Sequence, residues 1–133
     1  MNWLPLLLGA VAAFFLIRLV WQARPGLPLA EARAALEAGT AVLIDVREPA
    51  EWAAGVAKQS ALLPLSDLRG ERTQWGPFLK KNKGRQLLLY CASGTRSGMA
   101  AAQLRREGHD AVNAGSLSAW SRTGWPVGAP ARR

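Results

Sequence analysis

The sequence predicts an α/β fold in which helices flank a central, mainly parallel β-sheet, with one transmembrane helix before the folded domain. Two short runs, Ala41–Val46 and Gln86–Tyr90, are almost entirely apolar, which is typical of strands buried on both faces of a parallel sheet. Segments with helical spacing alternate with these runs, as in α/β proteins. A long run at the N-terminus that is apolar and almost free of charge distinguishes residues 1–23 from the rest.

The N-terminal run extends from Trp3 to Trp21 and holds one charged residue, Arg18, close to its end. As a helix it would be about 28 Å long, close to the thickness of the hydrocarbon core of a bilayer. The two tryptophans would lie at the two membrane interfaces, and the Arg18 side chain would extend to the nearer one. We therefore expect residues 1–23 to be a transmembrane helix that binds the protein to a membrane.

Two other interpretations of this run stay open. A cleaved signal peptide needs a basic start and a small-residue cleavage site, and neither is evident around the run. A buried soluble helix would show a polar face, which the run lacks. Arg18, Arg24 and Arg33 all follow the apolar core of the run, so the positive-inside rule places the domain in the cytoplasm. We therefore expect a single-pass membrane protein, which in a bacterium would lie in the inner membrane.

Composition excludes several classes of function. The chain carries a formal net charge of +8, one cysteine and one histidine. A single cysteine cannot form an intramolecular disulfide, and this Cys/His content makes neither a metal site nor a cofactor expected. The basic cluster Lys80–Arg85 is interpreted as a solvated loop that anionic lipid would attract. No basic motif interleaved with aromatic residues is present, so no nucleic-acid partner is expected.

The expected organisation follows from Pro/Gly content and hydrophobic periodicity. Residues 24–28 form a linker, 29–128 the folded domain and 129–133 a short basic tail. Within the domain we expect, in chain order, helix Leu29–Ala38, strand Ala41–Val46, helix Glu48–Gly55, an extended piece Ala61–Leu65, helices from Ser66 and over Trp75–Lys81, strand Gln86–Tyr90, helix Gly98–Glu107, strand Ala111–Asn113 and helix Ser116–Arg122. In helix Gly98–Glu107, residues Met99, Ala102 and Leu104 should face inward.

Cys91 is the residue that carries the functional argument. It follows the second buried strand and precedes a loop of small residues and a helix, and Asp45 ends the first strand at the same edge of the sheet. The N–H groups of such a loop can converge on one point and, with a helix N-terminus, supply positive potential. Gly94 permits an unusual backbone angle, and Arg96 adds a full charge. This site should lower the thiol pKa and hold an anionic group, a persulfide or an oxyanion. The alternative is a buried cysteine with only a packing role.

Four motifs, by their order and spacing, resemble a single rhodanese domain of the sulfurtransferase family. The resemblance covers roughly Leu29 to Val127. The motifs are Leu43–Glu48 with Glu51-Trp52, Leu63–Leu68, Tyr90–Ser97, and Gly115–Trp120 followed by Gly124–Val127.

The resemblance implies a nucleophilic Cys91 that takes a sulfane sulfur from a donor and passes it to a thiophilic acceptor such as cyanide or another thiol. The donor would be a small anion such as thiosulfate, or a protein that donates a persulfide. Asp45 and Arg47 would support the walls of the site through ion pairs. The family often carries a basic residue after the cysteine, and Ala92 stands there in this chain. The expected substrate-binding loop is Ala92, Ser93, Gly94, Thr95, Arg96 and Ser97.

Two other functions stay open. Phosphatases and arsenate reductases of this fold use a Cys…Arg loop that is one residue longer, whereas Cys91 to Arg96 spans six residues, and the shorter loop suits a sulfur atom. A non-enzymatic rhodanese-like module that brings partners to the membrane is the second alternative. The presence of Cys91 favours the enzyme, since an inactive domain could dispense with the thiol.

Overall fold

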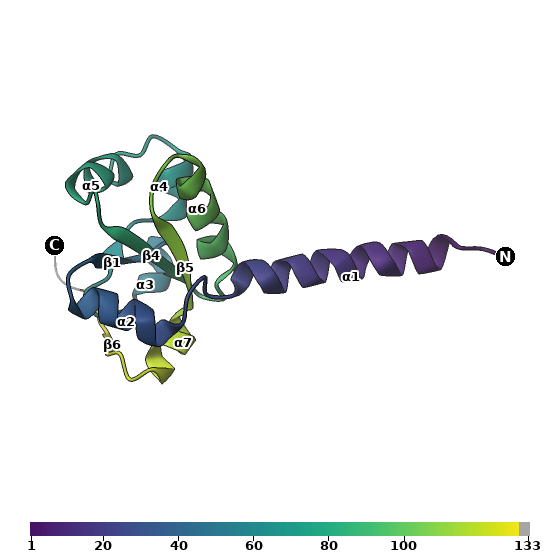
Figure 1. Cartoon of the computed structure of the whole chain (residues 1–133), viewed down its shortest axis with the longest axis horizontal. Coiled ribbons are helices and arrows are strands. Elements are labelled where there is room, and N and C mark those ends of the chain that lie inside the picture. Colours follow the sequence, from purple (N-terminus) through teal and green to yellow (C-terminus); the bar gives the residue numbers. More distant parts are fainter. Residues whose placement is uncertain (131–133) are drawn as a thin grey trace.

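Four strands form one parallel sheet in the computed structural model, which describes residues 1–130 of the chain (Figure 1). Their order is β3-β1-β4-β5, so β4 lies between β1 and β5. Asp45 pairs with Tyr90, which brings the carboxyl ends of β1 and β4 together at one edge. The parallel sheet expected from the apolar runs is confirmed. The strands are β1 (Ala41–Asp45), β3 (Ala61–Leu62), β4 (Gln86–Cys91) and β5 (Ala111–Ser116).

Helices cover both faces of this sheet. Successive residues of β4 point to opposite faces, so Leu87, Leu89 and Cys91 enter one hydrophobic layer and Leu88 and Tyr90 enter the other. The first layer is closed by α4 (Leu65–Arg69), α5 (Trp75–Lys81) and α6 (Thr95–Arg106), and the second by α2 (Leu29–Glu37) and α7 (Leu117–Arg122). The thiol therefore comes from the layer that α6 covers.

Several boundaries differ from those expected. Helix α6 begins at Thr95 rather than Gly98, because Gly94 at φ 91° reverses the chain just before it. Strand β5 extends to Ser116 rather than Asn113, because it follows β4 through the pair Cys91–Ser116. A small antiparallel pair, β2 (Val56–Ala57) with β6 (Val127–Gly128), was not expected. The short helix α3 (Pro49–Trp52) lies within its expected range.

The inward face of α6 also differs from the prediction. Leu104 is buried as predicted, but Met99 and Ala102 are partly exposed. Ala100 and Ala101 take the core positions instead, because their small side chains let the helix approach β4 and β5 closely. The prediction for Met99 and Ala102 was therefore wrong.

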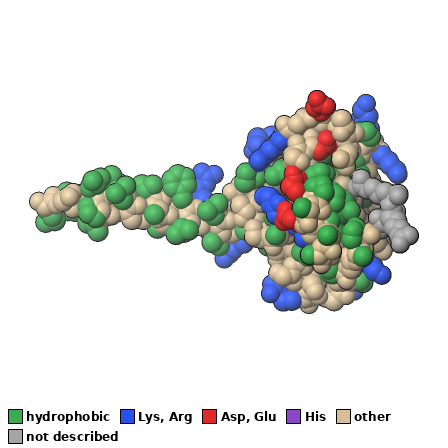
Figure 2. All heavy atoms as spheres, turned by 180° about the vertical axis from the view of Figure 1, so that it is seen from behind, with side chains coloured by type: hydrophobic (Ala, Val, Ile, Leu, Met, Phe, Trp, Pro, Cys, Tyr) green, Lys and Arg blue, Asp and Glu red, His purple; other side chains and the backbone are tan. Residues whose placement is uncertain are grey.

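Helix α1 (Leu4–Ala23) projects from the domain, and none of its residues is buried (Figure 1). It is long and apolar enough to cross a membrane, although a signal sequence shares these properties. Figure 2 shows hydrophobic side chains along the helix and basic side chains only toward its domain end. Residues 131–133 of the expected basic tail lie outside the described residues.

Candidate active site

Cys91 is the last residue of β4, and its side chain is fully buried at the carboxyl edge of the sheet. The chain turns back over the thiol at once, because Gly94 adopts the left-handed conformation before α6 begins. This turn aims the backbone N–H of Gly94 at the Cys91 Sγ atom, 3.0 Å away. The strand, loop and helix thus place a polarised N–H group against a buried sulfur.

Ser97, in the first turn of α6, is the second group beside the sulfur. Its hydroxyl oxygen is buried and lies 3.4 Å from the Cys91 Sγ atom. The same hydroxyl lies closer to the side-chain oxygen of Asn113, at 2.8 Å. The carbonyl oxygens of Gly94 and Gly115 lie 3.2 and 3.4 Å from this hydroxyl. Since one hydroxyl donates one proton, Ser97 donates to the sulfur only when it does not donate to one of these other acceptors.

Two opposing effects set the pKa of the Cys91 thiol. Burial raises this pKa, because the thiolate loses its hydration. Hydrogen bonds from the Ser97 hydroxyl and from the backbone N–H groups of Ser97, Ser93 and Gly94 favour the thiolate and lower it. The hydrogen bonds prevail, so the pKa lies below the ordinary value for a thiol. Such a shift increases the fraction of the nucleophilic form at neutral pH.

Arg96 forms an ion pair with Glu51, which lies in α3. The two guanidinium nitrogens donate to the two carboxylate oxygens over 2.6 and 2.8 Å. The hydrogen bond from Arg96 lowers the pKa of the Glu51 carboxyl to about 2. Arg96 thus fixes α3 beside the Cys91 loop, and its charge is partly neutralised there.

Asp45 and Arg47 form a buried ion pair at the end of β1. Their closest contact is 2.8 Å, and the Arg47 guanidinium also donates to the carbonyl oxygens of Gly55 at 2.7 Å and Glu51 at 3.4 Å. Burial disfavours the charged guanidinium, but the hydrogen bond and the charge of Asp45 outweigh this and raise the pKa of Arg47. The pair connects the end of β1 to α3 and to the turn that follows α3.

The other residues of the expected loop form its rim. Ala92 and Ser93 are exposed, and Thr95 is partly buried, with its hydroxyl 3.4 Å from that of Ser93. The structure therefore brings Gly94 and Ser97 against the sulfur, whereas Arg96 turns to Glu51. Whether the rim binds a substrate stays a prediction.

Two residues of this region were not among the site residues expected from the sequence. Glu51 belongs to the first of the four motifs, but nothing in the sequence indicates that it pairs with Arg96, 45 positions away. Asn113 was assigned only to a strand, yet its side chain bonds both Ser97 and the Gly94 carbonyl. A buried amide within an apolar strand is a signal that could have drawn attention to it.

A sequence model of the rhodanese-like domain matches residues 28–123, which is most of the folded part of the chain. The chain belongs to the rhodanese-like family. A protein of Allochromatium vinosum named a sulfurtransferase is 37% identical over 91 residues, covering 67% of this chain and 79% of that protein. An uncharacterised Synechocystis protein is also 37% identical over 88 residues, or 65% of this chain, but the chain spans only 46% of its length.

Solved rhodanese structures share this architecture. A rhodanese-related protein from Thermoplasma volcanium superposes with a TM-score of 0.65 at 26% identity, covering 80% of this chain and all of that one. The human single-domain sulfurtransferase superposes with a TM-score of 0.57 at 29% identity, covering 74% of this chain and 96% of that one. The rhodanese-like fold expected from the motifs is thus confirmed.

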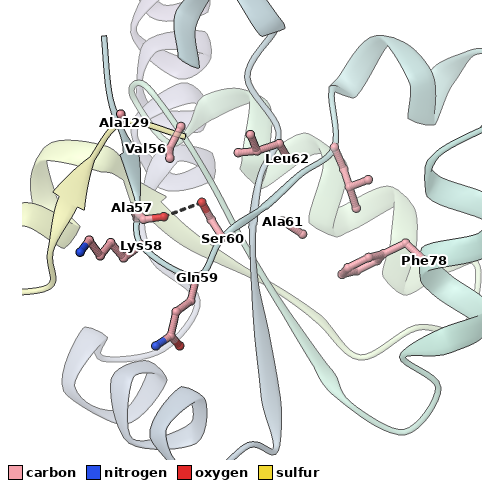
Figure 3. Close-up of a pocket in the computed structure, with 10 residues that line it drawn as sticks. Val56, Ala57, Lys58, Gln59, Ser60, Ala61, Leu62, Phe78 and Ala129 are labelled. Carbon is pink, nitrogen blue, oxygen red and sulfur yellow. Dashed lines mark hydrogen bonds between the residues drawn. The ribbon is translucent and has the colours of Figure 1, made fainter. Parts of the chain in front are cut away.

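A cavity of about 540 Å³ lies beside β2 and β3 of this rhodanese-like domain (Figure 3). It is lined by residues 56–63, Phe78 and Ala129, and the Ser60 hydroxyl donates to the Ala57 carbonyl at its wall. None of these residues belongs to the Cys91 loop. Among the described residues, no cluster of three His, Cys, Asp or Glu side chains could hold a metal ion.

Proposed function

We propose that this rhodanese-like protein is a sulfurtransferase that carries a sulfane sulfur as a persulfide on Cys91. The observation that supports this most is the Gly94 N–H group at 3.0 Å from the Cys91 Sγ atom, at the start of α6. A loop built in this way stabilises a negative charge that forms on or beside the sulfur. The relative named a sulfurtransferase, 37% identical over 91 residues, supports the same chemistry.

The reaction needs two displacements at sulfur. The Cys91 thiolate attacks the outer sulfur of thiosulfate, the S–S bond of the donor breaks, and sulfite leaves with the electron pair. The product is a persulfide anion on Cys91, whose terminal sulfur then lies among the loop N–H groups. A thiol or cyanide attacks this terminal sulfur, and the electron pair of the breaking bond returns to Cys91 as thiolate. A persulfide on another protein could replace thiosulfate in the first step.

The same geometry disfavours phosphatase or arsenate reductase chemistry. The loop from Cys91 to Arg96 counts six residues, one fewer than the loop of phosphatases and arsenate reductases of this fold. Phosphate ester hydrolysis also needs an acid that protonates the leaving group. Glu51 lies beside the loop, but its pKa of about 2 keeps it ionised at neutral pH. We therefore infer sulfur transfer rather than phosphoryl transfer.

We further propose that α1 is a retained membrane anchor and that the domain faces the cytoplasm. The carbonyl oxygens of Gln22 and Arg24, at the end of α1, accept hydrogen bonds of 2.9 and 3.0 Å from the Asn113 side chain. The end of the helix is thus part of the folded domain, which a cleaved signal peptide would not require. Intact mass of the protein from isolated membranes tests retention, since cleavage after Trp21 would remove the whole apolar run.

Mass spectrometry tests the chemistry directly. The full chain in detergent, incubated with thiosulfate and desalted, should gain about 32 Da, the mass of one sulfur atom, on Cys91. Cyanide should remove this mass and release thiocyanate. The Cys91→Ser variant should gain nothing. If neither thiosulfate nor an organic persulfide adds sulfur, the domain is a non-enzymatic module or carries out other chemistry, and the proposal is wrong.

A further inference from the structure

The end of α1 lies against the back of the Cys91 loop (Figure 1). The backbone N–H of Gly26 donates to the Asn113 carbonyl oxygen of β5 over 2.8 Å. The side-chain amide of Asn113 lies 2.9 Å from the Gln22 carbonyl oxygen and 3.0 Å from that of Arg24. The residues that follow the apolar helix are therefore bonded to the strand beside the thiol.

Two glycines of the loop and of α6 provide the space for this contact. A Cβ atom on Gly94 would overlap the carbonyl oxygen of Ala23, and one on Gly98 would overlap that of Gln22. Gly76, in α5, is a helical glycine with nothing within 4 Å of the same position. Glycine at 94 and 98 is thus required by the approach of α1.

The Asn113 side chain also contacts the catalytic loop. Its nitrogen lies 3.0 Å from the Gly94 carbonyl oxygen, so its two N–H groups are shared among three carbonyls. Its oxygen accepts from the Ser97 hydroxyl at 2.8 Å and from the Gly115 N–H at 3.0 Å. Ser97 in turn lies 3.4 Å from the Cys91 sulfur. One buried amide therefore connects the end of α1 with both groups that contact the thiol region.

We propose that Asn113 is a positioning residue that links the end of α1 to the Cys91 loop. The contact between the helix end and the domain would then determine the reactivity of the thiol. The carbonyl oxygens at the end of α1 fix the orientation of the amide, because they take its N–H groups. The fixed amide then presents its oxygen to Ser97 and its nitrogen to Gly94. When the helix end moves away, the Gly94 carbonyl is the one acceptor left for these N–H groups, so the orientation of the amide is less constrained and its hydrogen bond with Ser97 changes.

This inference rests on the proposed role of Cys91 as the reactive group, but not on any particular sulfur donor. Its measurable quantity is the midpoint of the pH dependence of Cys91 alkylation by iodoacetamide, which reports the thiolate fraction. The full chain in detergent micelles serves for all variants, since the helix must be present. Thermal unfolding followed by circular dichroism shows which variants are folded.

Gly98→Ala should displace the end of α1 and shift the midpoint by at least about half a pH unit, a threefold change in the thiolate fraction below the midpoint. Asn113→Ala should shift the midpoint as well. The double variant should show the shift of Asn113→Ala alone, because the displaced helix end and the added Cβ atom at position 98, 3.1 Å from the Asn113 side-chain nitrogen, both act through this amide. Gly76→Ala is the matched control and should leave the midpoint unchanged.

An unchanged midpoint in Gly98→Ala would overturn the inference, and so would additive shifts in the double variant. If Asn113→Ala does not fold, the contrast between Gly98→Ala and Gly76→Ala decides alone. The midpoint requires no sulfur transfer, so the link can hold when the sulfurtransferase proposal fails. Conversely, if the protein forms a persulfide but the variants show unshifted midpoints, the sulfurtransferase proposal stands and the role of Asn113 is rejected.

Discussion

Arg96 and Glu51 meet in a two-pronged ion pair, with nitrogen–oxygen distances of 2.6 and 2.8 Å, at the rim of the Cys91 loop. The only full charge that the sequence places within this loop is therefore bound by a carboxylate from α3. A second pair of the same form joins Arg72 to Glu107, also over 2.6 and 2.8 Å. Because this second pair involves none of the Cys91 loop residues, it provides a matched control for the first.

Glu51→Gln should improve the use of an anionic donor. The substitution keeps the shape of the side chain but removes a negative charge beside Arg96, which raises the positive potential at the loop. We expect the KM for thiosulfate to fall about two- to fivefold, the range of a partly exposed charge pair. The KM is measured from the steady-state rate of thiocyanate release in the presence of cyanide at varied thiosulfate concentration. Glu107→Gln should leave the KM unchanged, and an equal effect of both variants would contradict a local role.

The same ion pair should contribute to stability against acid. The Arg96 hydrogen bond lowers the pKa of Glu51 to about 2, below the value of about 4.3 for an unfolded chain. A depressed carboxyl pKa stabilises the fold above pH 4.3, and this contribution is lost as the pH falls toward 2. About a third of each side chain is exposed, so solvent screening limits the contribution to about 1 kcal/mol.

Unfolding curves of the wild type and of Glu51→Gln between pH 7 and pH 2 measure this contribution. The difference in unfolding free energy should be largest near neutrality and should vanish toward pH 2. A difference that stays constant over this range would show that the ionised carboxylate is not its source.

Arg47→Met should strongly destabilise the domain. Asp45 is fully buried and Arg47 is 5% exposed, so the substitution leaves a buried carboxylate without its partner. Such a loss costs about 3–5 kcal/mol, a large part of the stability of a small domain. The double variant Asp45→Asn/Arg47→Met should regain much of it, because no charge is then buried.

Urea unfolding of the full chain in detergent measures these effects. Glu37→Gln is the control, since it breaks the more exposed pair with Arg33 and should cost about 1 kcal/mol or less. Persulfide formation by the double variant should persist. A folded double variant that forms no persulfide would show that the Asp45–Arg47 pair does more than support the wall.

Ala92→Lys should make thiosulfate a better substrate. Ala92 is exposed at the rim next to Cys91, so a lysine there adds an unpaired positive charge close to the sulfur without displacing the core. The KM for thiosulfate should fall, and the gain should shrink as the ionic strength rises. Ala34→Lys, an exposed position on α2, is the control for net charge. A gain that is insensitive to salt would contradict the electrostatic explanation.

The sequence predicted the sheet and the place of the thiol because these depend on local patterns. A run such as Leu87–Tyr90 is apolar on both faces only in a covered strand, and in a parallel sheet such strands end at a common edge. The position of Cys91 at that edge followed directly. The two-residue strands β2 and β6 are too short for any periodicity, so their pairing appears only in the structure.

The partners within the site could not be predicted from the sequence. Glu51 and Asn113 lie 45 and 16 positions from the loop residues that they bond, and only the packing of α3 and the register of β5 bring them near. The contact of α1 with Gly94 and Gly98 could not be predicted for the same reason, because it joins segments that are far apart in the sequence. In the sequence, Gly94 indicates an unusual backbone angle and Gly98 the start of a helix, whereas the structure shows that both also leave space for the end of a helix.

Ser97→Ala should raise the pKa of the Cys91 thiol. Burial opposes the thiolate, and the Ser97 hydroxyl is the strongest of the groups that favour it. Its removal leaves only backbone N–H donors at the sulfur, so the alkylation midpoint should move upward and persulfide formation at neutral pH should slow. Ser93→Ala is the matched control, because Ser93 contributes its backbone N–H, which the substitution keeps. Equal midpoints in the wild type and Ser97→Ala would show that the turn at Gly94 alone stabilises the thiolate.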